Sequence, residues 1–175
     1  MISFKKQIQY SQFWLIKECS KIGVDLDYTV KSIEKIENLI VTNFNDGHPN
    51  PKGFFAKEID YKLFAISSYI GEVVIKNTKG SKWILNTKDR NALINAKVVS
   101  ANGTEMYPAH RVLNRIQNGE EDNLYHYTAI AVKEYMSFEG ERYLMDFLKR
   151  NLKVSLGGNF GEHKIAFIEN LSLIS

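Results

Sequence analysis

The sequence is nearly free of cysteine, since Cys19 is the only one among 175 residues. A single thiol cannot form an internal disulfide, so the disulfide framework of small secreted domains is excluded. A chain of this length buries roughly 70% of the surface that its unfolded form exposes, so it needs neither a disulfide nor a structural metal to fold. Cys19 falls on the apolar stripe of a predicted helix, and we interpret it as a buried, unreactive thiol.

Long apolar runs are also missing. No stretch approaches the length of about 18 uninterrupted apolar residues that a membrane-spanning helix requires, so we expect no membrane partner. The opening MISFKKQIQYSQFWLIKECS lacks the apolar centre and the small-residue cleavage site of a signal peptide. We therefore expect a cytoplasmic protein.

Charge of one sign does not accumulate anywhere in the chain. The net charge is +3, from 23 Lys and Arg against 20 Asp and Glu. Residues 1–88 hold 13 basic and 9 acidic side chains, and residues 89–175 hold 10 and 11. Nucleic-acid binders gather basic residues on one face or in one run, so we do not expect a nucleic acid as partner.

Residues for metal, phosphate or cofactor chemistry do not occur at the required spacings. The four histidines form no His-x-x-x-His pair, and no second cysteine exists, so the sequence predicts no metal site. The glycine-rich segment 157–161 is not followed by Lys and Ser or Thr, which excludes a P-loop. It lies between two apparent strands and is predicted to be a flexible turn. We expect no cofactor.

The hydrophobic pattern predicts an α+β fold with a single domain spanning residues 1–175. The predicted helices are 4–22, 27–44, 54–77, 108–118 and 123–149. Predicted strands lie within 82–107, with Asn102-Gly103 as a hairpin turn, and within 152–169 around a loop at 157–163. The helix at 54–77 has the broadest apolar side, so we expect it at the centre of the core.

Helix boundaries and polar faces follow from the same pattern. Asp27 is placed to cap the second helix, and Asp122 to cap the helix that begins at 123. In the second helix, Ile33, Ile36 and Ile40 form the buried stripe. We predict that its charged residues face the solvent on the other side: Lys31, Glu34, Lys35 and Glu37. The segment 45–51, with two prolines, is predicted to be a loop.

Glu72 is the carboxylate with the greatest chemical interest. It follows Gly71 inside an otherwise apolar helix, where the glycine allows another element to approach closely. A buried carboxylate needs a cation or several hydrogen-bond donors. Arg111 and Arg115, one turn apart on the helix at 108–118, are the candidate partners, and we favour a structural pair. Arg115 has an alternative partner in the acidic residues 120–122.

These residues belong to a recurring pattern. Tyr69-Ile70-Gly71-Glu72, then Trp83, then Pro108, then Arg115-Ile116-Gln117-Asn118-Gly119 resembles an uncharacterised bacterial domain family. That family shows Tyr-x-Gly-Glu, a Trp, a Pro that opens a short helix, and Arg-x-x-x-Gly. The resemblance covers residues 55–135. Some members resemble the small proteins encoded beside bacterial antagonistic toxins, so the resemblance implies an immunity-type protein with a cognate toxin.

Two functions follow as the main hypotheses, and nucleic-acid binding, which the mild positive surplus of residues 1–88 allows, is a third and weaker one. The first is a non-enzymatic protein-binding protein of the immunity type, which occludes a toxin. Its candidate binding residues are Tyr69, Glu72, Trp83, Arg111 and Arg115. Aromatic pairs at 54–55 and 125–127 are candidate anchors, although we favour a place for them in the core.

The second hypothesis is an enzyme that acts on a small polar or phosphorylated substrate. Arg111 and Arg115 would hold an anion, and Glu72 or His110 would move a proton as the catalytic residue. This hypothesis requires the four side chains to converge on one open cleft.

Overall fold

A computed structural model describes residues 3–133 and has the predicted α+β architecture, with helices packed on small antiparallel sheets. Its helices are α1 (Phe4–Lys21), α2 (Ser32–Asn43), α3 (Ile59–Asn77) and α4 (Pro108–Asn118). A 3-10 turn, η1 (Gly119–Asp122), leads from α4 into a helix at 124–133. The predicted strands within 152–169, the loop at 157–163 and the helix beyond 133 lie outside the described residues.

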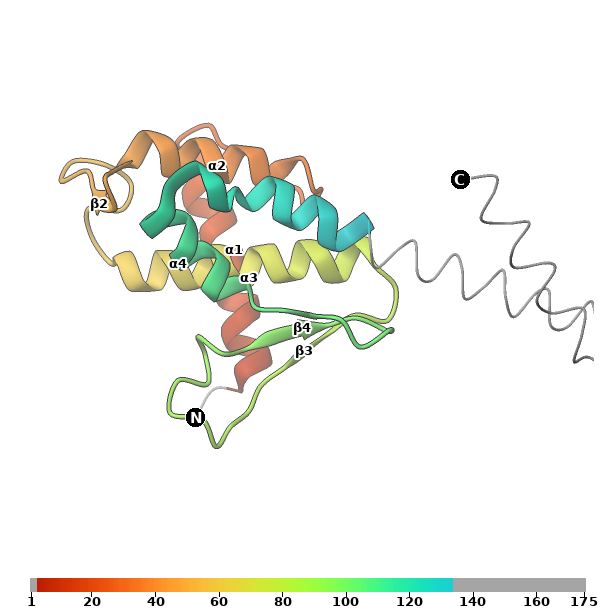
Figure 1. Cartoon of the computed structure of the whole chain (residues 1–175). Helices are drawn as coiled ribbons and strands as arrows, with labels where there is room; N and C mark the ends of the chain where they lie inside the picture. The colour runs from red at the N-terminus through yellow and green to blue at the C-terminus, as the bar shows by residue number, and fades with distance from the viewer. Residues whose placement is uncertain (1–2, 134–175) are drawn as a thin grey trace, which may run out of the picture. The chain divides into compact units, whose positions relative to one another are not determined.

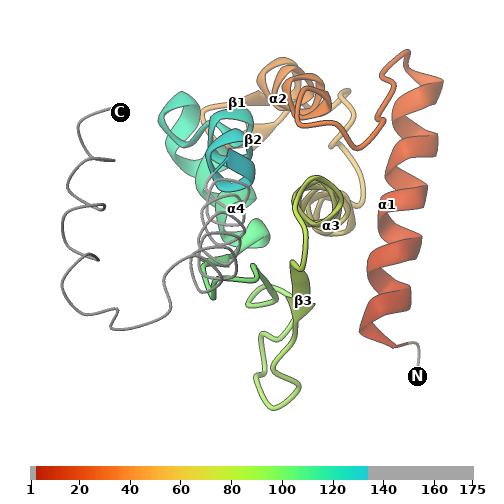
Figure 2. The same ribbon diagram turned by 90° about the vertical axis from the view of Figure 1, so that its right-hand side faces the viewer.

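Helix α3 occupies the centre of the described part, as predicted. Figure 2 looks along α3, with α1 on one side of it and α2 and α4 on others. Residues 65–71 of α3 are buried without interruption, together with Val73 and Val74. A helix that is buried on all sides must be contacted from several directions. The described helices include none that is both long and apolar enough to cross a membrane.

The larger sheet has the order β3-β4-β5 and is antiparallel throughout. Its strands are β3 (Lys82–Ile84), β4 (Lys97–Val99) and β5 (Glu105–Met106). The predicted turn at Asn102-Gly103 joins β4 to β5, and Gly103 has the positive φ of 87° that glycine tolerates. Figure 1 shows β3 and β4 side by side. Trp83, Val98 and Met106 lie opposite one another across the three strands, and all three pack in the hydrophobic core.

Helix α2 begins at Ser32, five residues later than predicted, and Asp27 does not cap it. The Asp27 carboxylate instead accepts hydrogen bonds from the Thr29 backbone N–H (3.0 Å) and hydroxyl (2.7 Å). These two bonds lower the pKa of Asp27 below its ordinary value. Tyr28 has a positive φ of 62°, a backbone conformation that no helix contains.

The segment between α2 and α3 differs from the prediction in a similar way. Helix α3 begins at Ile59, not at 54. The predicted loop contains a short hairpin of β1 (Phe44–Asn45) and β2 (His48–Pro49), which turns at Asp46-Gly47. Phe55 is buried although it precedes the helix, and it packs on the rings of Phe44 and Phe54. The interpretation of Phe55 as a core residue is therefore confirmed.

The prediction for α4 is confirmed, with Pro108 in its first turn and Gly119 immediately after it. The predicted cap of the following helix is off by one residue. Asn123 Oδ1 accepts the backbone N–H of His126 at 2.9 Å, as a helix cap does. Asp122 turns back toward α4, where its carboxylate accepts a hydrogen bond of 2.7 Å from Asn118.

Candidate functional site

Glu72 lies beside Trp83, and not beside the arginines of α4. Its Oε1 atom accepts a hydrogen bond of 3.0 Å from the indole Nε1 of Trp83. Gly71 provides the space for this contact, because a Cβ atom there would lie 2.0 Å from Cζ2 of the indole. The close approach expected at Gly71 is confirmed, and the element that approaches is β3. The Gly71-Glu72 step thus fixes the sheet to α3.

Arg115 pairs with Glu37 of α2, so the predicted pair with Glu72 is wrong. Arg115 Nε donates to Glu37 Oε2 at 2.7 Å, and the two residues are only 5% and 6% exposed. The other carboxylate oxygen of Glu37 accepts the backbone N–H of Leu124. One buried carboxylate therefore connects α2, α4 and the start of the helix at 124–133.

The prediction that Glu37 faces the solvent is wrong as well. The sequence does indicate that Glu37 is buried. Glu37 lies four residues after Ile33 and three before Ile40, which places it on the buried stripe of the helix. The hydrophobic pattern predicts the buried isoleucines, whereas charge alone is the basis on which Glu37 is predicted to face the solvent. A buried acid in such a stripe indicates a buried cation from another element.

Arg111 and His110 have separate partners. Arg111 Nη1 lies 3.4 Å from Asp122 Oδ1, and the guanidinium lies 4.1 Å from the centre of the Tyr127 ring. His110 Nε2 is 2.8 Å from Asn95 Oδ1, and its ring stacks on that of Tyr107.

Tyr69 is completely buried and serves as a core hydrogen-bonding residue. Its hydroxyl accepts the backbone N–H of Tyr28 at 2.8 Å and lies 2.7 Å from Ser32 Oγ. The Tyr69 and Tyr28 rings stack with their centres 5.0 Å apart. Burial raises the pKa of Tyr69 above its ordinary value. Burial also raises the pKa of Cys19 to about 11, which fits the interpretation of an unreactive thiol.

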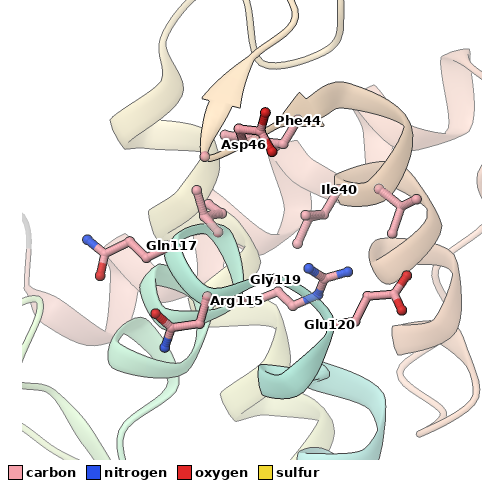
Figure 3. Close-up of a pocket in the computed structure, with 11 residues that line it drawn as sticks. Ile40, Phe44, Asp46, Arg115, Gln117, Gly119 and Glu120 are labelled. Atoms are coloured by element: carbon pink, nitrogen blue, oxygen red, sulfur yellow. The ribbon is translucent and has the colours of Figure 1, made fainter.

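A hollow of about 300 Å³ lies between the C-terminal ends of α2 and α4. Its apolar wall comes from Ile40, Val41, Phe44 and Ile116, and its polar residues include Arg115, Asp46 and Glu120. Figure 3 shows the Arg115 side chain beside Ile40, with Asp46 across the hollow. Of the four residues proposed for an enzyme, only Arg115 lines this hollow.

Exposed aromatic and basic residues follow one side of α1. We call this side the outer face of α1 and define it by Lys6, Tyr10, Phe13, Lys17 and Lys21. Phe13 is 69% exposed and Tyr10 is 58% exposed. The spacing of four, three, four and four residues places all five on one side of the helix. At 100° per residue, this side lies opposite the buried residues of α1, which include Ile8, Leu15 and Cys19.

The outer face of α1 is not among the predicted sites, although its spacing is present in the sequence. The helical spacing predicts an apolar stripe of Ile8, Leu15, Cys19 and Ile22. The first three are buried as predicted, whereas Ile22 follows the end of α1 and is 52% exposed. A helix whose buried stripe is already complete should carry polar residues elsewhere. Tyr10 and Phe13 are exceptions to that rule, and their position outside the buried stripe indicates an exposed binding surface. A shallow hollow of about 420 Å³ borders Phe13 and Lys17.

Residues 3–133 contain no group of three or more acidic, His or Cys side chains that could hold a metal ion. Comparison with known proteins finds no family model, no curated protein and no solved structure that matches the chain. The resemblance of the Tyr-x-Gly-Glu pattern to a bacterial domain family therefore stays a prediction, and the function is argued from the residues themselves.

Proposed function

We propose that the protein is a non-enzymatic, immunity-type bacterial protein that binds a protein toxin and occludes it, with the outer face of α1 as the contact surface. The observation that carries this proposal is the exposure of Phe13 and Tyr10 side by side on one helix. Burying such a side chain in an interface contributes roughly 1.5–3 kcal/mol relative to leaving it in water. Tyr is also among the residues that dominate binding hot spots.

The charges around the aromatic pair favour a partner of opposite charge. Lys6 and Lys17 form no ion pair with any residue of the described part of the chain, whereas Lys21 pairs with Glu18 at 2.5 Å. Two uncompensated ammonium groups flank an apolar centre. The complementary surface is an apolar patch bordered by Asp or Glu, and such complementarity favours both specificity and fast association. The proposed toxin therefore presents an acidic rim.

The residues considered for catalysis support binding over chemistry. Glu72, Arg115, Arg111 and His110 each contact a different partner, and these partners lie on different elements. The contacts of Glu72 and Arg115 hold β3 and α2 in place. Side chains committed to such contacts serve the fold, and the protein-binding hypothesis needs no catalytic role from them.

Affinity purification of the tagged full-length chain from the source organism tests the proposal. We expect one acidic protein to be retained in stoichiometric amount by the native chain and lost from the Tyr10→Ser/Phe13→Ser variant. The control is Ile130→Ser, which changes a side chain of similar exposure (56%) on the helix at 124–133. The recovered protein should inhibit growth when expressed alone, and co-expression of the native chain should restore growth.

Two results would count against this function. One is the same set of retained proteins for the native chain and the double variant. The other is a retained protein that does not affect growth, which would leave a binding role but exclude the immunity role.

A further inference from the structure

The guanidinium of Arg115 keeps most of its donors free. An arginine carries five N–H donors, and Glu37 accepts only the one on Nε. Within residues 3–133, no residue accepts a hydrogen bond from either terminal nitrogen of Arg115. The side chain is nevertheless only 6% exposed. The terminal nitrogens are not among the fully buried polar atoms that lack a partner, since Ser68 Oγ is the only such atom in the described residues. Because Arg115 lines a hollow, a ligand in that hollow can supply acceptors to these donors.

The hollow in front of Arg115 has a volume at the lower end of the range for small-molecule sites. Figure 3 shows the guanidinium between Ile40 and Glu120, inside the ring of lining residues. Val41 and Phe44 close one side with apolar surface. The site thus combines an apolar wall with a buried, preorganised donor group.

Two carboxylates stand at the rim of the same hollow. Asp46 and Glu120 are both exposed and line it, and within the described residues neither takes part in an ion pair or a side-chain hydrogen bond. Arg115 is already neutralised by Glu37. The hollow therefore carries an excess of negative charge around a cluster of free donors.

This combination discriminates between ligand classes. A purely anionic ligand would find donors on Arg115 but would be repelled by Asp46 and Glu120. A purely cationic ligand would pair with the carboxylates of Asp46 and Glu120 but would offer no hydrogen-bond acceptor to the guanidinium of Arg115. A molecule with one carboxylate and two cationic groups satisfies both requirements.

We propose that this hollow binds a free basic amino acid, whose carboxylate accepts hydrogen bonds from the terminal nitrogens of Arg115. The two cationic groups of the ligand interact with Asp46 and Glu120. This site is separate from the outer face of α1 and does not depend on the function proposed above. No bond is made or broken, so the proposal concerns binding alone.

Isothermal titration calorimetry of the full-length chain with L-lysine tests the proposal, with L-lysinamide, L-norleucine and L-glutamate as comparison ligands. We expect saturable binding of L-lysine. The amide lacks the carboxylate and norleucine lacks the second ammonium, so each should bind at least about tenfold more weakly, a change worth about 1.4 kcal/mol. Glutamate should not bind.

Variants then locate the binding. Asp46→Asn/Glu120→Gln changes only exposed side chains and should weaken L-lysine binding at least about tenfold. Val41→Trp should fill the hollow and abolish binding. The control is Ile130→Trp, which lies outside the hollow and should have no effect on binding. The two native side chains have similar exposure, 52% for Val41 and 56% for Ile130. Circular dichroism establishes whether each variant is folded. If Val41→Trp does not fold, the Asp46→Asn/Glu120→Gln variant tests the proposal.

Three outcomes would overturn the proposal. The first is no binding of L-lysine up to about 10 mM, a concentration that corresponds to less than about 3 kcal/mol of binding free energy. The others are equal binding of L-lysine by the native chain and the folded Val41→Trp variant, and tighter binding of glutamate than of lysine.

Discussion

Gly71 shows how one absent side chain determines a contact between two elements. The Trp83 indole lies where a Cβ atom would be, and its Nε1 donates to the neighbouring Glu72. Trp83 also packs edge-on against Phe4 of α1, with ring centres 5.9 Å apart. The position of one indole therefore links β3 to both α3 and α1.

Replacing Gly71 by Ala should lower the free energy of unfolding by about 1 to 3 kcal/mol, because the indole must move out of its site. This loss should appear although Ala raises helix propensity by about 1 kcal/mol relative to Gly. Urea unfolding followed by circular dichroism measures the change. The indole N–H resonance of Trp83 should shift as the hydrogen bond to Glu72 is lost.

The control for this change is Ser68→Ala on the same helix. Ser68 is buried, and its hydroxyl has no hydrogen-bond partner in the described part of the chain. Removing an unsatisfied hydroxyl should leave the stability equal or higher. A Gly71→Ala variant as stable as Ser68→Ala would contradict the role given to Gly71.

Single residues were predictable where the cause was local. A glycine inside an apolar helix indicates a close approach, and Gly71 confirms this. The partner of Glu72 was not predictable, because Trp83 reaches it only after the chain leaves α3 and returns as β3. The partner of Arg115 lies 78 residues away on α2, a distance in sequence over which local patterns carry no information.

At the scale of elements, the carboxylate of Glu37 joins three helical segments. It accepts hydrogen bonds from Arg115 on α4 and from the backbone of Leu124. A buried ion pair gains from its short contact and loses from the removal of both charges from water. The net contribution of the ion pair to the free energy of unfolding is therefore smaller than the stability lost when only one of its two residues is replaced.

A double-mutant cycle on this pair should show strong coupling. Glu37→Leu or Arg115→Met alone leaves a charge buried without its partner and should lower the free energy of unfolding by about 3–5 kcal/mol. The double variant should lose much less than the two single losses together. Urea unfolding of the four proteins measures the coupling. Additive losses would show that the two charges do not depend on each other.

Elements were predictable where hydrophobic periodicity dominates and less so where side chains bond to nearby backbone. The ranges of α1 and α4 and the β4–β5 turn follow from the sequence. The starts of α2 and α3 do not, because Asp27 and Thr29 form a local turn and Phe55 is buried without being helical. The segments 27–31 and 54–58 have apolar residues at spacings that also fit a helix, and tertiary contacts determine their conformation.

At the scale of the described molecule, α1 lies at the edge and is covered on one side only. Figure 1 shows it running across α3, which buries Ile8, Leu15 and Cys19 from that side. The opposite side exposes Tyr10 and Phe13 between lysines. The sequence predicts α1 itself, but only the packing shows which aromatic residues stay uncovered.

The most direct test of this account measures the affinity of the purified partner for the native chain and for Lys17→Glu, at low and at high salt. We predict weaker binding by the variant at low salt, and a smaller difference between the two proteins at high salt, because exposed charges are screened. Ile130→Glu, on the helix at 124–133, should bind as the native chain does. Equal affinities of the native chain and Lys17→Glu at low salt would contradict the assignment of the outer face of α1 as the binding surface.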